Sequence, residues 1–259
     1  MVLDSNSKII IIGGEGFVGS AYQRYCQQNN LNYLVINRGN YQHYIGEKCD
    51  VLINANGNSK KFLGKENPLQ DFDESVRSVR RSLIDFSAHK YIFLSSCDVY
   101  PDCSNPDSTR EDNIIDISRQ SPYGFHKYLA EQCVIHCHSD WLIFRMGGFV
   151  GEGLKKNAIF DILQGEKLWL HPDSALQYIH TDVAARVVME IIQKGYTQEI
   201  FNLCGNGLIK LQEAIDRTQS QVKVNLDLNP VYYEVSIDKI QQIVNIPSTR
   251  DTVLDFVNE

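Results

Sequence analysis

The sequence lacks the features that direct a chain to a membrane, a secretory route or a nucleic acid. No apolar run approaches the length of a membrane-spanning helix, and the polar start from Met1 to Ser7 has no basic segment leading into an apolar one. Positive charge is scarce, with 25 lysines and arginines against 32 aspartates and glutamates, a net charge of −7. Nucleic-acid binding needs clustered lysine and arginine. We therefore expect a cytoplasmic protein that binds neither membrane nor nucleic acid.

Disulfide and metal frameworks are also missing. Seven cysteines, an odd number in a chain of 259 residues, indicate reduced thiols. Cys133, His136, Cys137 and His138 lie close in sequence, but on a helix the two histidines do not both join the face that the two cysteines share. No second Cys/His pair follows at a zinc-like spacing. We therefore predict no metal site.

Short apolar runs alternate with amphipathic segments over the first part of the chain. Runs typical of buried parallel strands occupy residues 8–12, 33–36, 50–53, 90–95 and 140–145. Helical patterns lie between them, the clearest over residues 68–87 and 123–138. This alternation predicts an α/β fold of the Rossmann type with a doubly wound parallel sheet.

The pattern changes after Arg145. Glycines gather at 147, 148, 151 and 153, a helix is predicted near 157–163, and later elements alternate less regularly. We predict a dinucleotide-binding Rossmann domain over residues 1–146. A small C-terminal substrate lobe is expected over residues 147–259, with a stretch of about 178–205 returning to the first domain.

A glycine-rich turn follows the first predicted strand directly and leads into a helix. It consists of Gly13-Gly-Glu-Gly16-Phe17-Val18-Gly19. Glycines here allow a tight turn, a close approach of the backbone to a pyrophosphate, and a helix N-terminus aimed at negative charge. Because the turn stands between a strand and a helix, the pattern is specific. We predict that Gly13, Gly16, Phe17, Val18 and Gly19 bind a dinucleotide.

Asn37 and Arg38 close the second predicted strand, where an NAD site usually has an acid that holds the ribose hydroxyls. Arg38 is suited instead to a 2′-phosphate, which favours NADP. Glu15, inside the glycine turn, would either repel that phosphate or pair with Arg38. We predict that Asn37 and Arg38 contact the cofactor, with NADP preferred and NAD as the alternative.

Small residues follow the third predicted strand as Asn54-Ala55-Asn56-Gly57. Residues of this size at the carboxyl end of a parallel strand let a cofactor lie over the sheet edge. We assign all four to the cofactor site, although a plain turn has the same composition.

Tyr123 and Lys127 stand four residues apart on a predicted helix, and this spacing stacks both side chains on one face. A tyrosine with its ordinary pKa of about 10 is a poor base at neutral pH, and a neighbouring ammonium lowers that pKa. The pair can then move a proton to or from an alcohol or ketone while a hydride moves to or from the cofactor. Ser96, at the end of the fourth predicted strand, can hydrogen-bond the reacting oxygen.

Asp98 and His126 lie beside these residues in the sequence. A carboxylate next to a bound substrate can do acid–base work, and aspartate also caps turns or is solvated at strand ends, so both roles stay open for Asp98. His126 precedes Lys127 directly but falls on another helix face, which predicts a structural role.

Taken together, the motifs resemble the extended short-chain dehydrogenases/reductases, the NAD-dependent epimerase/dehydratase family. The glycine turn, Ser95-Ser96-Cys-Asp98-Val-Tyr and Tyr123-Gly-Phe-His-Lys127 occur in the family's order at about its spacing. Stretches at 177–184 and 200–205 look like its later landmarks.

The resemblance implies a catalytic triad of Ser96, Tyr123 and Lys127, in which Lys127 also holds the nicotinamide ribose. It implies a sugar or nucleotide-sugar substrate and a homodimer. Dehydratases of this kind often have an acid at the position of Asp98, where it takes part in eliminating water.

Three departures from the family concern the substrate. The chain is short for the family, Leu176 replaces an arginine that grips the diphosphate, and one residue is missing after His180. Gly147 and Gly148 stand where a substrate-facing Asn or Thr usually follows the fifth strand. Lysines that might otherwise hold the phosphates are Lys155, Lys156 and Lys167.

The first prediction is therefore an NAD(P)-dependent oxidoreductase, epimerase or dehydratase acting on a sugar or nucleotide-sugar by hydride transfer. The missing diphosphate arginine keeps a reductase of a non-sugar carbonyl as an alternative. A non-catalytic dinucleotide-binding sensor is a third reading, against which the retention of Ser96, Tyr123 and Lys127 counts.

Overall fold

The computed structural model describes residues 3–258, which divide into two compact units. The first unit is built from three segments, Met1–Pro101, Ile114–Met146 and Ala185–Phe201. The second is built from Asp102–Asn113, Gly147–Ala184 and Asn202–Glu259. No helix among the described residues combines the length and apolarity that crossing a bilayer requires.

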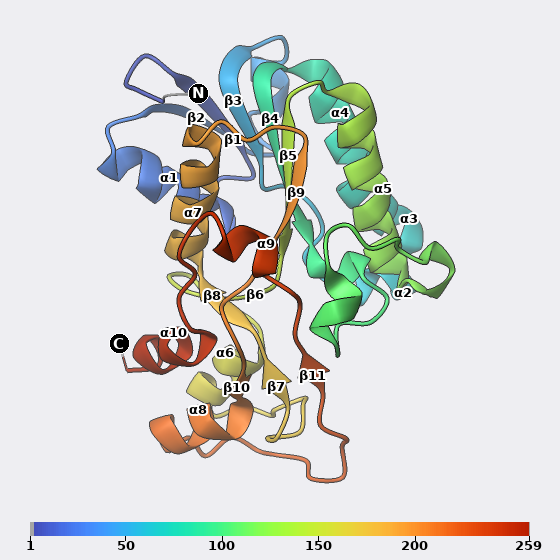
Figure 1. Ribbon diagram of the computed structural model, residues 1–259, viewed down its shortest axis with the longest axis vertical. Coiled ribbons are helices and arrows are strands. Elements are labelled where there is room, and N and C mark those ends of the chain that lie inside the picture. The colour runs from blue at the N-terminus through green and yellow to red at the C-terminus, as the bar shows by residue number, and fades with distance from the viewer. Residues whose placement is uncertain (1–2, 259) are drawn as a thin grey trace. The chain divides into compact units, whose positions relative to one another are not determined.

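A six-stranded sheet forms the centre of the first unit (Figure 1). Its order is β2-β1-β3-β4-β5-β9, and the pairs from β2 through β5 are parallel. The strands are β1 (Lys8–Ile12), β2 (Asn32–Ile36), β3 (Lys48–Asn54), β4 (Ser87–Ser96), β5 (Trp141–Met146) and β9 (Glu199–Leu203). The Rossmann-type parallel sheet and all five strands predicted for the first part of the chain are confirmed.

Helices cover both faces of this sheet, with α1 and α7 on one side and α4 and α5 on the other (Figure 1). The helices of the unit are α1 (Gly19–Gln28), α2 (Leu63–Glu66), α3 (Pro68–Phe72), α4 (Ser78–Asp85), α5 (Pro122–Cys137) and the part of α7 (Thr181–Gln193) from Ala185. Short helices are η1 (Tyr41–Tyr44), η3 (Cys97–Val99) and η5 (Ile117–Arg119).

The segment predicted as one helix over residues 68–87 is more complex. Asn67 caps its start by accepting from the amide of Gln70 at 3.2 Å, and a π-helical stretch, η2 (Asp73–Arg77), separates α3 from α4. The prediction was wrong at its end, because the helix stops at Asp85 and β4 begins at Ser87.

Apolar side chains from the sheet and the helices fill the core of this unit. Ile10, Leu52 and Phe93 come from three adjacent strands and pack with Val79 of α4 and Val134 of α5. All five are fully buried. Burial of a side chain of this size contributes about 1.5–3 kcal/mol, so the core holds α4 and α5 firmly against the sheet.

The second unit has its own core and smaller sheets. Strands β10 (Ile209–Lys210), β7 (Ala175–Leu176) and β11 (Tyr232–Tyr233) form one sheet, and β6 (Gly148–Val150) pairs with β8 (Tyr178–His180). Its helices are η4 (Pro106–Thr109), α6 (Ala158–Gln164), α8 (Leu211–Thr218), α9 (Asp238–Gln241) and α10 (Thr249–Phe256). Helix α6 begins at Ala158, close to the predicted start near 157.

Candidate active site

The order of the strands has a switch point at the carboxyl ends of β1 and β3. Strand β2 pairs with one edge of β1, and β3 pairs with the other edge of β1. In open parallel sheets, ligands bind at such a switch point. The glycine turn and residues 54–57 follow these two strands, so the fold brings the first and third predicted motifs to one edge of the sheet.

The glycine turn has the tight geometry that the sequence predicted. Gly13 has φ +77° and donates its amide to the carbonyl of Ile36 at 2.8 Å, while its own carbonyl accepts from the amide of Gly16 at 3.0 Å. A Cβ on Gly19, the first residue of α1, would overlap that same carbonyl of Gly13. Only glycine therefore lets α1 start so close to the turn.

The glycine turn is in direct contact with residues 54–57. A Cβ added to Gly13 would lie 3.1 Å from backbone atoms of Ala55 and Asn56. Asn54 has a different place, because its side chain is fully buried and donates to Tyr91 Oη at 2.7 Å. It also accepts from the amide of Asn56 at 3.0 Å, so Asn54 supports the turn from inside the core.

Arg38 and Glu15 do not pair with each other. Glu15 accepts from the side-chain amide of Asn37 at 2.8 Å. Arg38 lies 3.7 Å from a carboxylate oxygen of Glu74, and 84% of its side chain is exposed. A loose, exposed pair of this kind contributes little, so Arg38 can move to a phosphate at small cost.

Local sequence at the start of α5 fixes Tyr123. Ser121 caps the helix by accepting from the amide of Gly124 at 3.0 Å, and Pro122 takes the first position, where no amide donor is needed. Gly124 packs on the carbonyl of Asp98 so closely that a Cβ would overlap it. The first turn of α5 is thereby held against η3.

Lys127 is buried one turn after Tyr123, and its side chain points to Gly57 in the segment of residues 54–57. Its Nζ lies 3.0 Å from the position of a Cβ on Gly57 and 5.5 Å from the centre of the Phe93 ring. Burial lowers the pKa of Lys127 to about 8, although the carboxylates of Asp71, Glu131 and Asp98 each raise it. The sheet edge, the glycine turn and this ammonium therefore belong to one site.

The surroundings of Tyr123 favour the protonated form of its phenol. Burial raises its pKa well above the ordinary value, the charge of Asp98 raises it further, and a hydrogen bond with Ser96 lowers it. The sequence predicts a pKa lowered by the nearby ammonium, and this prediction is wrong because burial, the largest effect, raises it. Tyr123 can thus donate a proton at neutral pH.

Asp98 has both of its carboxylate oxygens engaged. Lys61 Nζ lies 2.8 Å from Oδ1 and 2.7 Å from Oδ2. The hydroxyl of Ser96 donates to Oδ2 at 3.0 Å, and Ser96 Oγ accepts from the amide of Asp98 at 3.1 Å. Asp98 therefore accepts a hydrogen bond from the Ser96 hydroxyl and forms an ion pair with Lys61.

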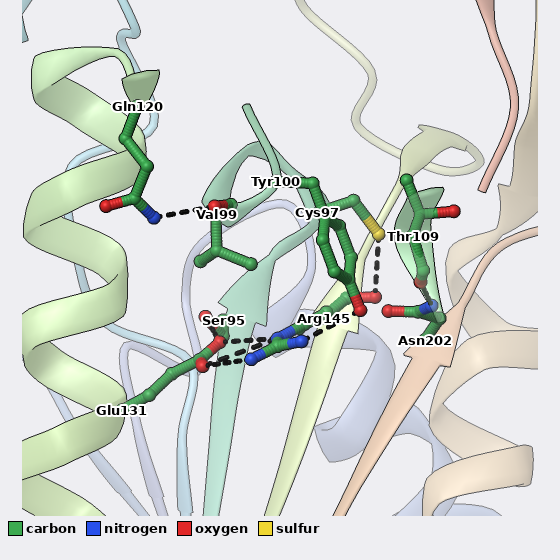
Figure 2. A network of polar contacts seen from close by, with 9 residues as sticks. All are labelled: Ser95, Cys97, Val99, Tyr100, Thr109, Gln120, Glu131, Arg145 and Asn202. Atoms are coloured by element: carbon green, nitrogen blue, oxygen red, sulfur yellow. Dashed lines mark hydrogen bonds and ion pairs between the residues drawn. The ribbon is translucent and has the colours of Figure 1, made fainter. Parts of the chain in front are cut away.

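A buried ion pair, absent from the sequence predictions, lies next to residues 95–100 (Figure 2). Glu131, one turn after Lys127 on α5, pairs with Arg145 of β5 at 2.8 Å, and both side chains are almost completely buried. Ser95 donates to Glu131 at 2.6 Å, and Arg145 donates to Tyr100 Oη at 2.8 Å. The pair thus fixes both ends of the segment that carries Ser96 and Asp98. In the sequence, the only indication of Glu131 is that it follows Lys127 by four residues, which places both side chains on one face of the helix.

Two histidines near the motifs have structural contacts. His126 Nδ1 lies 2.7 Å from a carboxylate oxygen of Asp71 in the interior of the first unit. His180, in the second unit, accepts from the amide of Asp182 at 3.2 Å, at the start of α7. Among residues 3–258, no three His, Cys, Asp or Glu side chains gather where they could hold a metal ion.

The residues that depart from the family pattern lie in the second unit. A Cβ on Gly147 would overlap Cys204 Sγ, and one on Gly148 would meet the carbonyl of Gln177 at 2.6 Å, so packing requires glycine at both positions. Leu176 lies in β7, between β10 and β11. Lys167 places its Nζ 4.1 Å from the centre of the Trp169 ring.

Replacing Gly57 with alanine is expected to abolish most activity. Its φ of +146° strains any residue with a Cβ, at about 1–3 kcal/mol, and the new methyl would press on Lys127 Nζ. Gly46→Ala is the matched control, because Gly46 has φ +93° but open space around it. Both variants should lose stability in thermal unfolding, and only Gly57→Ala should lose turnover. Equal turnover in the two would contradict the assigned place of Lys127.

Comparisons with known proteins show the family of the chain and agree with its fold. A model of the NAD dependent epimerase/dehydratase family matches residues 9–204. No curated protein sequence matches significantly. Similar solved structures include a dTDP-4-dehydrorhamnose reductase from Bacillus anthracis in complex with NADP, at TM-score 0.78, 14% identity and coverage of 96% of this chain and 98% of that one.

Two further structures are equally similar in fold. RMD from Pseudomonas aeruginosa complexed with NADPH has TM-score 0.77 and 16% identity, covering 97% of this chain and 99% of that one. MoeE5 in complex with UDP-glucose and NAD has TM-score 0.79 and 12% identity, covering 97% of each chain. Because the family model spans well over half of the sequence, the chain belongs to the NAD-dependent epimerase/dehydratase family.

Proposed function

We propose that this protein is an NADP-dependent reductase of a carbonyl group on a nucleotide-sugar. The observation that carries the proposal is the place of Tyr123, which is buried at the start of α5 with Lys127 one turn later. Burial and the charge of Asp98 raise the pKa of its phenol, which favours the protonated form. Reduction of a carbonyl needs a proton donor at its oxygen, whereas oxidation of an alcohol, the first step of epimerases and dehydratases, needs a base. The free site is therefore prepared for reduction.

The residues that would hold the cofactor fit a dinucleotide. Glycine is required by packing at positions 13 and 19 of the turn and by φ at position 57. The N-terminus of α1 would face the pyrophosphate, and Arg38 would pair with the 2′-phosphate. When bound, NADPH supplies the hydride that reaches the carbonyl carbon.

Tyr123 then donates its hydroxyl proton to the carbonyl oxygen, and the product is an alcohol. The phenolate that remains is stabilised by the ammonium of Lys127 and takes a proton from solvent before the next turnover. Ser96 orients Tyr123 through their hydrogen bond. Asp98, paired with Lys61, accepts from the Ser96 hydroxyl in the free site and is not a free acid for eliminating water.

Several similar structures support the substrate class. Two are dTDP-4-dehydrorhamnose reductases, one of them in complex with NADP, and RMD is complexed with NADPH. The test is consumption of NADPH with a panel of keto-sugar nucleotides, starting with dTDP-4-dehydrorhamnose, and of small ketones and aldehydes. Turnover of a keto-sugar nucleotide supports the proposal. Interconversion of UDP-glucose or UDP-glucuronic acid without net NADPH consumption would replace it with an epimerase.

Arg38→Ala is expected to weaken NADPH binding by about tenfold to a hundredfold, since a charge-assisted pair with a phosphate contributes about 1.5–3 kcal/mol. Binding of NADH should change little. Calorimetric titration of both cofactors measures the difference, with Arg77→Ala as the control, because Arg77 is a similarly exposed arginine on η2. Unchanged NADPH affinity in Arg38→Ala would show that NADP selectivity does not come from Arg38.

A reductase of a non-sugar carbonyl is the second candidate. It is favoured by Leu176, which lies within β7 where the family usually has an arginine for the diphosphate. Turnover of small ketones or aldehydes, with none of the keto-sugar nucleotides, would establish it. A protein that binds NADPH and reduces neither class would be a dinucleotide sensor.

A further inference from the structure

Asp71 is a fully buried carboxylate that the proposed reaction does not use. It lies in α3, within the first unit, and none of its surface is accessible. A buried carboxylate costs several kcal/mol unless hydrogen bonds or opposite charge compensate it. Its place in the core therefore needs a physical reason.

Both oxygens of Asp71 are engaged by different parts of the site. Oδ1 accepts from the side-chain amide of Asn58 at 2.7 Å and from the hydroxyl of Ser75 at 3.2 Å. Oδ2 lies 2.7 Å from Nδ1 of His126, the residue before Lys127 on α5. Asp71 thus ties the turn after Gly57 to the helix that carries the catalytic pair.

Asp71 also lies close to the start of that helix. A Cβ on Gly64 would be 3.1 Å from Asp71 Oδ2 and 2.8 Å from the backbone nitrogen of Tyr123, so both atoms border one small space. Asn58 continues the connection, because it donates to the carbonyl of Lys60 at 2.9 Å and accepts from its amide at 2.7 Å. These bonds shape the turn that presents Lys61 to Asp98.

Three carboxylates act on the Lys127 ammonium, and two of them have a cation of their own. Glu131 on α5 pairs with Arg145, and Asp98 in η3 pairs with Lys61. Asp71 has no lysine or arginine partner within the described part of the chain; its partners are Asn58, Ser75 and His126.

Uncharged groups also lie near the ammonium. They include the ring of Phe93 on β4, 5.5 Å from Nζ, the backbone at Gly57, and the phenol of Tyr123 one turn earlier on α5. The side chain of Glu74 pairs with Arg38.

We infer that Asp71 is a positioning residue for Tyr123 and Lys127. It fixes the first turns of α5 through His126 and the turn after Gly57 through Asn58, and it places a negative charge beside the start of this helix. The inference rests on the proposed function for its effect on turnover. Its electrostatic part does not, because the protonation of Lys127 can be followed without cofactor or substrate.

The sign of the effect follows from Coulomb's law. A negative charge near an ammonium raises its pKa, and Asp71 raises that of Lys127 against the lowering by burial, to a value of about 8. The ammonium is present below this pKa and lost above it. Removing the charge of Asp71 lowers the pKa of Lys127, so Lys127 loses its proton at a lower pH. The fall of kcat at alkaline pH should therefore also begin at a lower pH.

Asp71→Asn tests this with little change in shape. The readout is the titration of the Lys127 Cε resonance in protein labelled with 13C-lysine, assigned by its loss in Lys127→Met. We expect a midpoint near pH 8 in the wild type and a proton-dissociation constant about tenfold larger, roughly one pH unit lower, in the variant. The alkaline limb of kcat should shift by a similar amount.

Two controls separate charge from structure. Asp73→Asn makes the same change two residues away on the surface and should leave the Lys127 midpoint unmoved. His126→Asn removes a partner of Asp71 but keeps the carboxylate, so it should lose stability without lowering the midpoint. Asp71→Ser, which leaves room for water, is the second variant if Asp71→Asn does not fold.

An unchanged Lys127 midpoint in a folded Asp71 variant overturns the inference, as does an equal fall of the midpoint in His126→Asn. Failure of the wild type to reduce any substrate, with the midpoint shifted as expected, instead overturns the proposed function alone. The two claims therefore fail separately.

Discussion

Tyr123→Phe is expected to lower kcat by about 10²–10⁴-fold while NADPH binding stays within a few-fold of the wild type. Removal of one hydroxyl takes away the proton donor, and the ring that fills the buried space remains. Stopped-flow measurement of NADPH oxidation gives the rate of the step, and calorimetry gives the affinity.

Tyr128→Phe is the matched control for this variant, since Tyr128 lies on the same helix and loses the same atom. It should keep most of the activity of the wild type. If Tyr123→Phe also kept it, the proton would have to come from another group, and the assignment of Tyr123 would be wrong.

Loss of the Glu131 side chain should produce the largest loss of stability. Glu131→Ala leaves the Arg145 guanidinium buried without its carboxylate, and breaking a buried pair in this way costs about 3–5 kcal/mol. The free energy of unfolding in urea, compared with the wild type, measures this cost. Activity should fall as well, because Ser95 loses its acceptor next to Ser96.

A partly exposed glutamate on α7 supplies the comparison for Glu131. Glu190 pairs with Arg186 at 3.4 Å on the surface, so Glu190→Ala should cost less than about 1 kcal/mol. The double variant Glu131→Leu with Arg145→Met should recover part of the lost stability, because it leaves no unpaired charge. A loss in Glu131→Ala as small as that in Glu190→Ala would show that the buried pair is not required.

Local patterns in the sequence were enough to predict the sheet and the glycine turn. A buried parallel strand is apolar along its whole length, as in residues 8–12, and the turn at Gly13 needs positive φ and close packing that glycine alone provides. These constraints act over a few residues, so they are visible without the fold.

Contacts between distant segments were not predictable in this way. Asp71 meets His126 across 55 residues, and Lys61 meets Asp98 across 37. Asn54 shows the same limit, because its residue type suits a cofactor edge while the fold turns its amide to Tyr91. Which side of a turn a polar side chain takes depends on packing that only the tertiary structure defines.

The most direct test of the central claim is transfer of deuterium from the nicotinamide C4 of deuterated NADPH to dTDP-4-dehydrorhamnose and the rest of the keto-sugar nucleotide panel. Our account predicts a product with deuterium on the former carbonyl carbon, formed by the wild type and by Tyr128→Phe and at least a hundredfold more slowly by Tyr123→Phe, in line with the usual loss of an acid catalyst. NADPH binding without deuterium transfer to any member of the panel would contradict it.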